Sequence, residues 1–116
     1  MKDNVVKDKS LEFAVRIVNL YKFLVNEQKE FVMSKQILRS GTSIGANIRE
    51  AEQAQSRADF INKLNIALKE ANETEDWLEL LIRTEYITRE QYESINNDST
   101  EINKLLISII KTTKNY

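Results

Sequence analysis

Apolar residues recur at every third or fourth position in four successive stretches of this chain, and this spacing constrains the fold more than any other feature. The chain contains no proline, and no run of alternating β-branched and aromatic residues predicts a strand. A hydrophobic content of 41% with 30% charged residues is typical of a globular domain rather than a disordered chain. The 116 residues therefore predict one all-α domain.

Capping signals divide residues 1–116 into four helices, expected at about 10–29, 34–54, 57–83 and 89–113. Each expected helix starts beside a serine or threonine that can accept a backbone hydrogen bond as an N-cap. These residues are Ser10, Ser34, Ser56 and Thr88. Because the connecting turns are only a few residues long, neighbouring helices should pack antiparallel. We predict a single up-down-up-down four-helix bundle.

The first expected helix carries two apolar stripes side by side. One stripe consists of Leu11, Ala14, Val18, Tyr21 and Val25, and the other of Phe13, Ile17, Leu20 and Leu24. At about 100° per residue the two together span roughly 200°, whereas one core needs only slightly more than 100°. We therefore expect a surplus apolar face, and we assign the second stripe to an oligomer interface.

Both glycines of the chain, Gly41 and Gly45, fall four residues apart inside the second expected helix. Glycine costs about 1 kcal/mol relative to alanine in a helix, so a pair of glycines needs a packing reason. Both lie near or on the inward stripe formed by Ile37, Gly41, Ile44, Ile48 and Ala51. We predict that Gly41, Gly45 and Ala51 allow a close helix–helix contact. A phosphate-binding loop is not supported, because no strand precedes the glycines.

The third expected helix carries a mixed line of residues at heptad spacing: Ile66, Glu70, Glu73, Trp77 and Leu80. Carboxylates between apolar neighbours are costly unless they are paired. We expect arginines such as Arg16, Arg49 or Arg57 to pair with them, within the subunit or across an interface. An aromatic and aliphatic strip rimmed by charge is typical of an interface, so this line is the second part of the expected oligomer contact. The alternative is that it closes the core of the monomer.

The amino acids that the chain lacks exclude several kinds of chemistry. Cysteine and histidine are both absent, which excludes disulfides, thiolate metal sites and Ser-His or Cys-His nucleophiles. A carboxylate metal site built from Glu50, Glu70 and Glu73 is a weaker hypothesis, because bundle sites of this kind also use histidine. We therefore predict a protein that is not an enzyme and binds no cofactor. The polar N-terminus and the lack of a long apolar segment predict a cytoplasmic protein that makes no membrane contact.

Nucleic-acid binding is the alternative function. The candidate contacts are basic residues of the first two expected helices: Arg16, Lys22, Lys35, Arg39 and Arg49. A net charge of −1 and a pI near 5.6 argue against a strongly basic domain. A ring of subunits would nevertheless repeat a local basic patch by symmetry.

Three central segments resemble a known family. Residues 43–51 (SIGANIREA), residues 60–68 and residues 70–78 (EANETEDWL) are similar to the bacterial four-helix bundle proteins encoded in 23S rRNA intervening sequences. The resemblance covers the chain from Phe13 to about Ile110. It implies an up-down bundle that assembles into a ring-shaped homopentamer. A related branch, the accessory variability proteins of diversity-generating retroelements, is strongly basic and is implied to bind nucleic acid and a reverse transcriptase.

From the residues and the resemblance together, we expect a homo-oligomeric structural or adaptor protein associated with RNA or a ribonucleoprotein. Its interface would use Phe13, Ile17, Leu20 and Leu24 of the first helix and the mixed line of the third.

Overall fold

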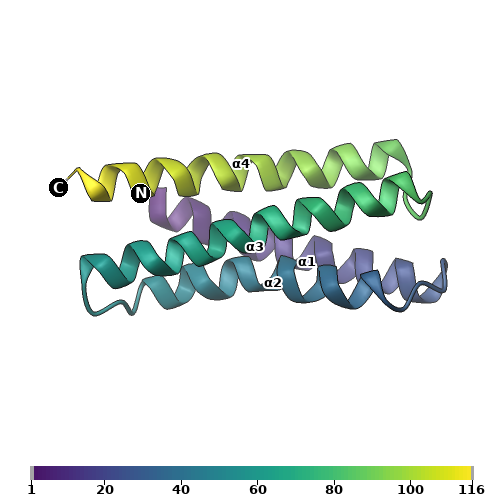
Figure 1. Cartoon of the computed structure of the whole chain (residues 1–116), viewed down its shortest axis with the longest axis horizontal. Coiled ribbons are helices and arrows are strands. Elements are labelled where there is room, and N and C mark those ends of the chain that lie inside the picture. Colours follow the sequence, from purple (N-terminus) through teal and green to yellow (C-terminus); the bar gives the residue numbers. More distant parts are fainter. Residues whose placement is uncertain (1, 116) are drawn as a thin grey trace.

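The computed structural model describes the backbone of residues 2–115 and the side chains of residues 5–115. This part of the chain forms the helices α1 (Lys2–Asn26), α2 (Met33–Ala51), α3 (Arg57–Arg83) and α4 (Arg89–Lys114), and it contains no strand. The helices lie lengthwise beside one another and alternate in direction (Figure 1). The predicted all-α, up-down-up-down four-helix bundle is confirmed.

Each helix packs against two neighbours around a single core. Helix α1 contacts α2 and α4, and α3 contacts the same two helices from the opposite corner. All four helices bury aliphatic side chains in one cluster along a bundle that is 47 Å long. The largest wholly buried side chains are Phe13, Ile17, Leu24, Ile37, Ile44, Leu64, Leu78, Leu81, Ile102 and Leu106.

Helix α1 begins at Lys2, so the helix start predicted near residue 10 and the N-cap predicted at Ser10 are wrong. Ser10 is wholly buried within the helix, and its hydroxyl donates to the Lys7 carbonyl oxygen at 2.8 Å. A serine hydroxyl can bond to a backbone carbonyl of the preceding turn as well as cap a helix. Val6, one turn before Ser10, extends the apolar core toward the N-terminus.

Helix α2 begins at Met33 and is capped by Glu30, so the N-cap predicted at Ser34 is also wrong. The N–H groups of Val32, Met33 and Ser34 donate to the Glu30 carboxylate at 3.1, 2.9 and 2.7 Å. Glu30 is only 7% exposed. Burial raises the pKa of this carboxyl group, but the N–H bonds outweigh burial and hold the pKa below its ordinary value. A charged cap therefore organises the turn between α1 and α2.

The N-caps predicted at Ser56 and Thr88 are confirmed. The Ser56 hydroxyl accepts the Asp59 N–H at 3.0 Å. Thr88 and Gln91 form a capping box, in which the Thr88 hydroxyl accepts the Gln91 N–H and the Gln91 side chain accepts the Thr88 N–H. These reciprocal bonds satisfy two backbone donors at the start of α4.

The two stripes of α1 are placed the opposite way from the prediction. Phe13, Ile17, Leu20 and Leu24 are buried in the core of the single chain, so their assignment to an oligomer interface is wrong. The other stripe, from Leu11 to Val25, lies half-buried or exposed on the outside. The inner stripe has the bulkier side chains, and burying them removes more apolar surface from water. Both stripes have the same spacing, so spacing alone could not orient the helix.

Candidate functional site

Helices α1 and α2 come together closely at the two glycines. A Cβ atom added to Gly41 would lie 2.7 and 2.8 Å from Cγ1 and Cγ2 of Ile17. A Cβ added to Gly45 would lie 3.2 Å from the Ser10 hydroxyl oxygen. Both glycines are buried, and Ala51 is buried at the last residue of α2. The missing side chains of the glycines therefore set the distance between the two helices.

The outer side of this contact is an apolar surface, which we call the α1–α2 face. It consists of Leu11, Ala14, Val15, Val18, Tyr21 and Val25 of α1 with Leu38, Thr42 and Ala46 of α2. Leu11 is 53% exposed and Val15 is 55% exposed, while the other members are half-buried. The Thr42 hydroxyl donates to the Leu38 carbonyl oxygen at 2.7 Å. Because this bond turns the hydroxyl toward the backbone, the methyl group of Thr42 adds to the apolar surface.

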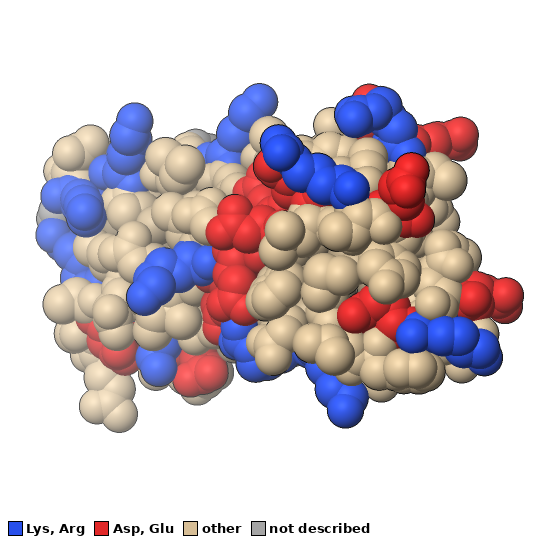
Figure 2. Space-filling view, turned by 45° about the vertical axis from the view of Figure 1, so that its right-hand side comes forward, with Lys and Arg blue, Asp and Glu red and all other residues tan. Residues whose placement is uncertain are grey.

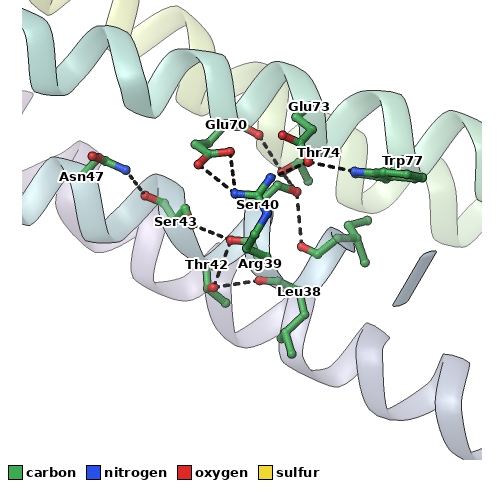
Figure 3. A network of polar contacts seen from close by, with 11 residues as sticks. Leu38, Arg39, Ser40, Thr42, Ser43, Asn47, Glu70, Glu73, Thr74 and Trp77 are labelled. Carbon is green, nitrogen blue, oxygen red and sulfur yellow. Dashed lines mark hydrogen bonds and ion pairs between the residues drawn. The ribbon is translucent and has the colours of Figure 1, made fainter. Parts of the chain in front are cut away.

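On the other side of α2, Arg39 joins the two carboxylates of α3 (Figure 3). Its Nη1 donates to Glu70 at 3.1 Å, and its Nη2 donates to Glu73 Oε2 at 2.5 Å. Glu73 Oε2 also accepts the Trp77 indole N–H at 3.0 Å. The prediction that Glu70 and Glu73 pair with an arginine is met within the subunit. The partner is Arg39, however, and not Arg16, Arg49 or Arg57.

These bonds shift the pKa values of Glu73 and Arg39. The bond from Arg39, with help from the Trp77 N–H, lowers the pKa of Glu73. The bonds to Glu73 and then to Glu70 raise the pKa of Arg39. Beneath the network, the hydroxyls of Ser40 and Thr74 lie 2.8 Å apart and share a buried hydrogen bond between α2 and α3. The network ties α2 to α3 and uses Glu70 and Glu73, and the third carboxylate of the metal hypothesis, Glu50, pairs with Lys63.

The expected oligomer line of α3 lies at the edge of this network. Leu80 is 45% exposed, and Ile66 and Trp77 are half-buried. Trp77 packs partly against the core. The line therefore closes the core on its inner side and presents an apolar and acidic edge on its outer side.

The basic residues expected to contact nucleic acid divide into paired and unpaired groups. Arg16 pairs with Asp98 of α4 at 2.7 Å, and Arg39 is held by the α3 carboxylates. Lys22, Lys35 and Arg49 have no ion pair within the described residues. The paired arginines thus contribute to the bundle itself, and the other cations lie at the edges of the α1–α2 face.

Two features that residues 2–115 lack bear on the site. No group of three or more Asp, Glu, His or Cys side chains in this part of the chain is arranged to hold a metal ion. None of its helices has the combination of length and apolar character that crossing a bilayer requires.

Comparison with known proteins places the chain in a family. A family model described as 23S rRNA-intervening sequence protein matches residues 2–108. The chain belongs to this family. A crystal structure of a protein with unknown function, from the S23 ribosomal protein family of Bacteroides thetaiotaomicron VPI-5482, is 99% identical over 96% of this chain and 99% of the other, with a TM-score of 0.95. No curated protein matches the chain.

In this member of the 23S rRNA-intervening sequence protein family, sequence reasoning missed the exposed residues Leu11 and Val15. One signal could have pointed to them. Val15 belongs to neither of the two stripes, and it widens the apolar arc on the side of Leu11 rather than on the side of Phe13. The pairing of Arg39 was missed as well, because it depends on how α2 is rotated against α3.

Proposed function

We propose that the chain is a non-enzymatic, self-associating four-helix bundle with a structural or adaptor role in the cytoplasm. The observation that carries the proposal is the α1–α2 face, which remains on the outside after every helix has packed. An exposed aliphatic surface of this kind, bordered by charge, is typical of a protein interface. A second copy of the chain is the partner that we argue for.

A second apolar surface on the same chain supports a second copy as the partner. The unpaired cations Lys22, Lys35 and Arg49 border the α1–α2 face, and Arg49 Nη1 lies 3.5 Å from the position of a Gly45 Cβ. The outer line of α3 offers exposed Leu80, half-buried Trp77 and Ile66, and carboxylates beside them. The apolar face of one copy can therefore pack against the apolar edge of the next, while Glu70 and Glu73 keep Arg39 as their partner.

Contact between two different faces has a consequence for symmetry. Head-to-tail contacts form a closed ring when the rotation between copies allows it, and an open filament when it does not. A ring agrees with the homopentamer that the sequence resemblance implies. Neither of the two faces includes α4, so an adaptor can hold another partner on that helix.

Sedimentation or light scattering at micromolar concentration tests the proposal. One subunit weighs 13.5 kDa, and we expect a defined multiple of this mass. Val15→Glu should reduce the mass to one subunit, because it places a carboxylate in the centre of the contact. Ile107→Glu on α4 is the matched control, since Ile107 is also exposed but lies away from both faces.

A wild-type mass of one subunit would refute self-association. A multimer that survives Val15→Glu but dissociates with Ile107→Glu would place the interface on α4 and refute the proposed face. Circular dichroism of both variants should match the wild type, because neither residue is buried.

A further inference from the structure

Two helix segments at one end of the bundle carry lysines but no carboxylates of their own. Residues 60–69 of α3 and residues 102–115 of α4 contain no aspartate or glutamate, although the chain as a whole has more acidic than basic residues. The two segments are neighbours in space. Asn103 donates to Glu75 at 2.6 Å, and from this bond both helices continue to the end of the bundle that holds the chain termini (Figure 1).

Four lysines of these segments have no ion pair within the described residues: Lys69, Lys104, Lys111 and Lys114. We call them the lysine strip. All four are exposed. The remaining lysine of the segments, Lys63, pairs with Glu50 of α2. Figure 2 shows basic side chains prevailing at this end of the bundle and a band of acidic side chains across its middle.

Three of the four lysines follow the axis of α4. Lys104 and Lys111 are seven residues apart, so they project from nearly the same side of the helix at a separation of about 10.5 Å along the axis. Lys114 lies a further 4.5 Å along, by the same estimate of about 1.5 Å per residue. The row ends where the carboxylates begin, at Glu75 and Glu101. Both of these carboxylates are already engaged, by Asn103 and by Lys9.

We propose that the lysine strip binds the phosphodiester backbone of double-stranded nucleic acid. Like charges held in a row repel one another, and a polyanion relieves this repulsion and releases its own counterions. The chemistry of the strip favours contact with the backbone of a duplex. Residues 102–115 contain no aromatic side chain on which an unpaired base could stack, and phosphate contacts by lysine carry no sequence information.

An anionic membrane would attract the same charges, but the structure favours it less. Ile107 is the one exposed large apolar side chain that the described part of α4 presents, and a helix that lies in a bilayer surface buries an apolar face. The inner face of α4 is already buried in the bundle core. Each copy carries the whole strip, so the proposal does not depend on self-association.

Fluorescence anisotropy with a labelled duplex of about 20 base pairs, as RNA and as DNA of the same sequence, tests the strip. We expect binding that weakens between about 50 and 200 mM salt, with a slope of the logarithm of affinity near −3 to −4 if all four lysines contact phosphate. Lys104→Gln with Lys111→Gln should make the slope shallower by about 2 and weaken binding about tenfold or more at the lower salt. Comparing the two duplexes shows whether RNA or DNA is preferred.

The matched control is Lys29→Gln with Arg89→Gln, which removes the same charge from two exposed residues at the opposite end of the bundle, in the turn between α1 and α2 and at the start of α4. We expect this control to bind like the wild type. Absence of binding to both duplexes at the lower salt would overturn the proposal. Equal weakening by both double variants would show a general charge effect and would also overturn the proposal, and weakening by the control alone would place the site at the opposite end of the bundle. Binding to phosphatidylserine vesicles but to neither duplex would identify a lipid surface instead.

Discussion

Replacing Gly41 with alanine tests the contact between α1 and α2 directly, because a single methyl group is the whole perturbation. The new Cβ would lie 2.7 and 2.8 Å from Cγ1 and Cγ2 of Ile17 and 3.2 Å from its Cβ. Ile17 is wholly buried and branched at Cβ, so it has little freedom to rotate away. Overpacking of this kind costs about 1–3 kcal/mol. Alanine recovers about 1 kcal/mol of helix propensity. The expected net loss of stability is therefore about 0–2 kcal/mol.

Gly45→Ala is the matched comparison within the same helix. Its added Cβ would lie 3.2 Å from the Ser10 hydroxyl oxygen, a contact that a shift of a few tenths of an ångström relieves. The gain in helix propensity is the same, so we expect this variant to be nearly as stable as the wild type or more stable. Gly41→Ala should then be less stable than Gly45→Ala by about 1–3 kcal/mol. Gly45→Leu, which adds three more carbons, should lose about 1–3 kcal/mol.

Urea unfolding followed by far-UV circular dichroism measures these differences. All variants should be compared at one protomer concentration, because self-association makes apparent stability depend on concentration. Ile17→Ala supplies a double-mutant cycle with Gly41→Ala, in which the new methyl group should occupy part of the space that Ile17 vacates. We expect the two changes to cost less together than the sum of their separate costs. Our account of the contact would be wrong if Gly41→Ala were as stable as Gly45→Ala and if the stability losses of Gly41→Ala and Ile17→Ala were additive in the cycle.

Three smaller predictions concern caps and ion pairs. Glu30→Ala should cost about 1–2 kcal/mol, as removal of a strong N-cap does. The pKa of Glu30 is lowered in the folded state, so the ionised carboxylate stabilises the fold above about pH 4.5. This stabilisation should fade as pH falls through the folded pKa. The melting curves of the wild type and of Glu30→Ala should therefore converge in acid. Arg39→Met should cost no more than about 1 kcal/mol at neutral pH, because Arg39 and Glu73 are both partly exposed and water screens the pair. The loss of stability caused by Arg39→Met should become smaller in acid, because the folded pKa of Glu73 is also lowered and the ion pair is lost once Glu73 is protonated. Thr88→Ala should lower the free energy of unfolding by about 0.5–2 kcal/mol. Ser56→Ala removes a cap of the same kind and should lower the free energy of unfolding by a similar amount. An unchanged urea midpoint for either variant would contradict the capping argument.

Helix type and number could be predicted from the sequence because they depend on local patterns. The caps at Ser56 and Thr88 were recognisable for the same reason, since the bonds that they make reach only three residues along the chain. Ser10 and Ser34 show where local reasoning fails. Both have the residue type of an N-cap, but Val6 extends α1 beyond Ser10, and Glu30 caps α2 before Ser34.

The candidate site was less predictable, because it depends on how the helices are rotated about their axes. Two apolar stripes on α1 satisfied the same periodicity, and only packing against α2 decided that Ile17 faces inward while Leu11 and Val15 remain outside. The pairing of Glu70 and Glu73 with an arginine followed from the cost of an unpaired carboxylate. That the arginine is Arg39 could not be predicted in the same way, because Arg39 lies on another helix, more than thirty positions from the two carboxylates in the sequence.

The sequence by itself thus determined the four-helix bundle and the family, since periodicity, turn chemistry and the central segments are written along the chain. The tertiary structure decided which surfaces remain available. It placed the apolar α1–α2 face outside, used Arg16 and Arg39 in ion pairs, and left Lys69 of α3 and three lysines of α4 exposed. The physical reason is that a helix is defined by contacts three and four residues apart, whereas a surface is defined by what distant segments leave uncovered.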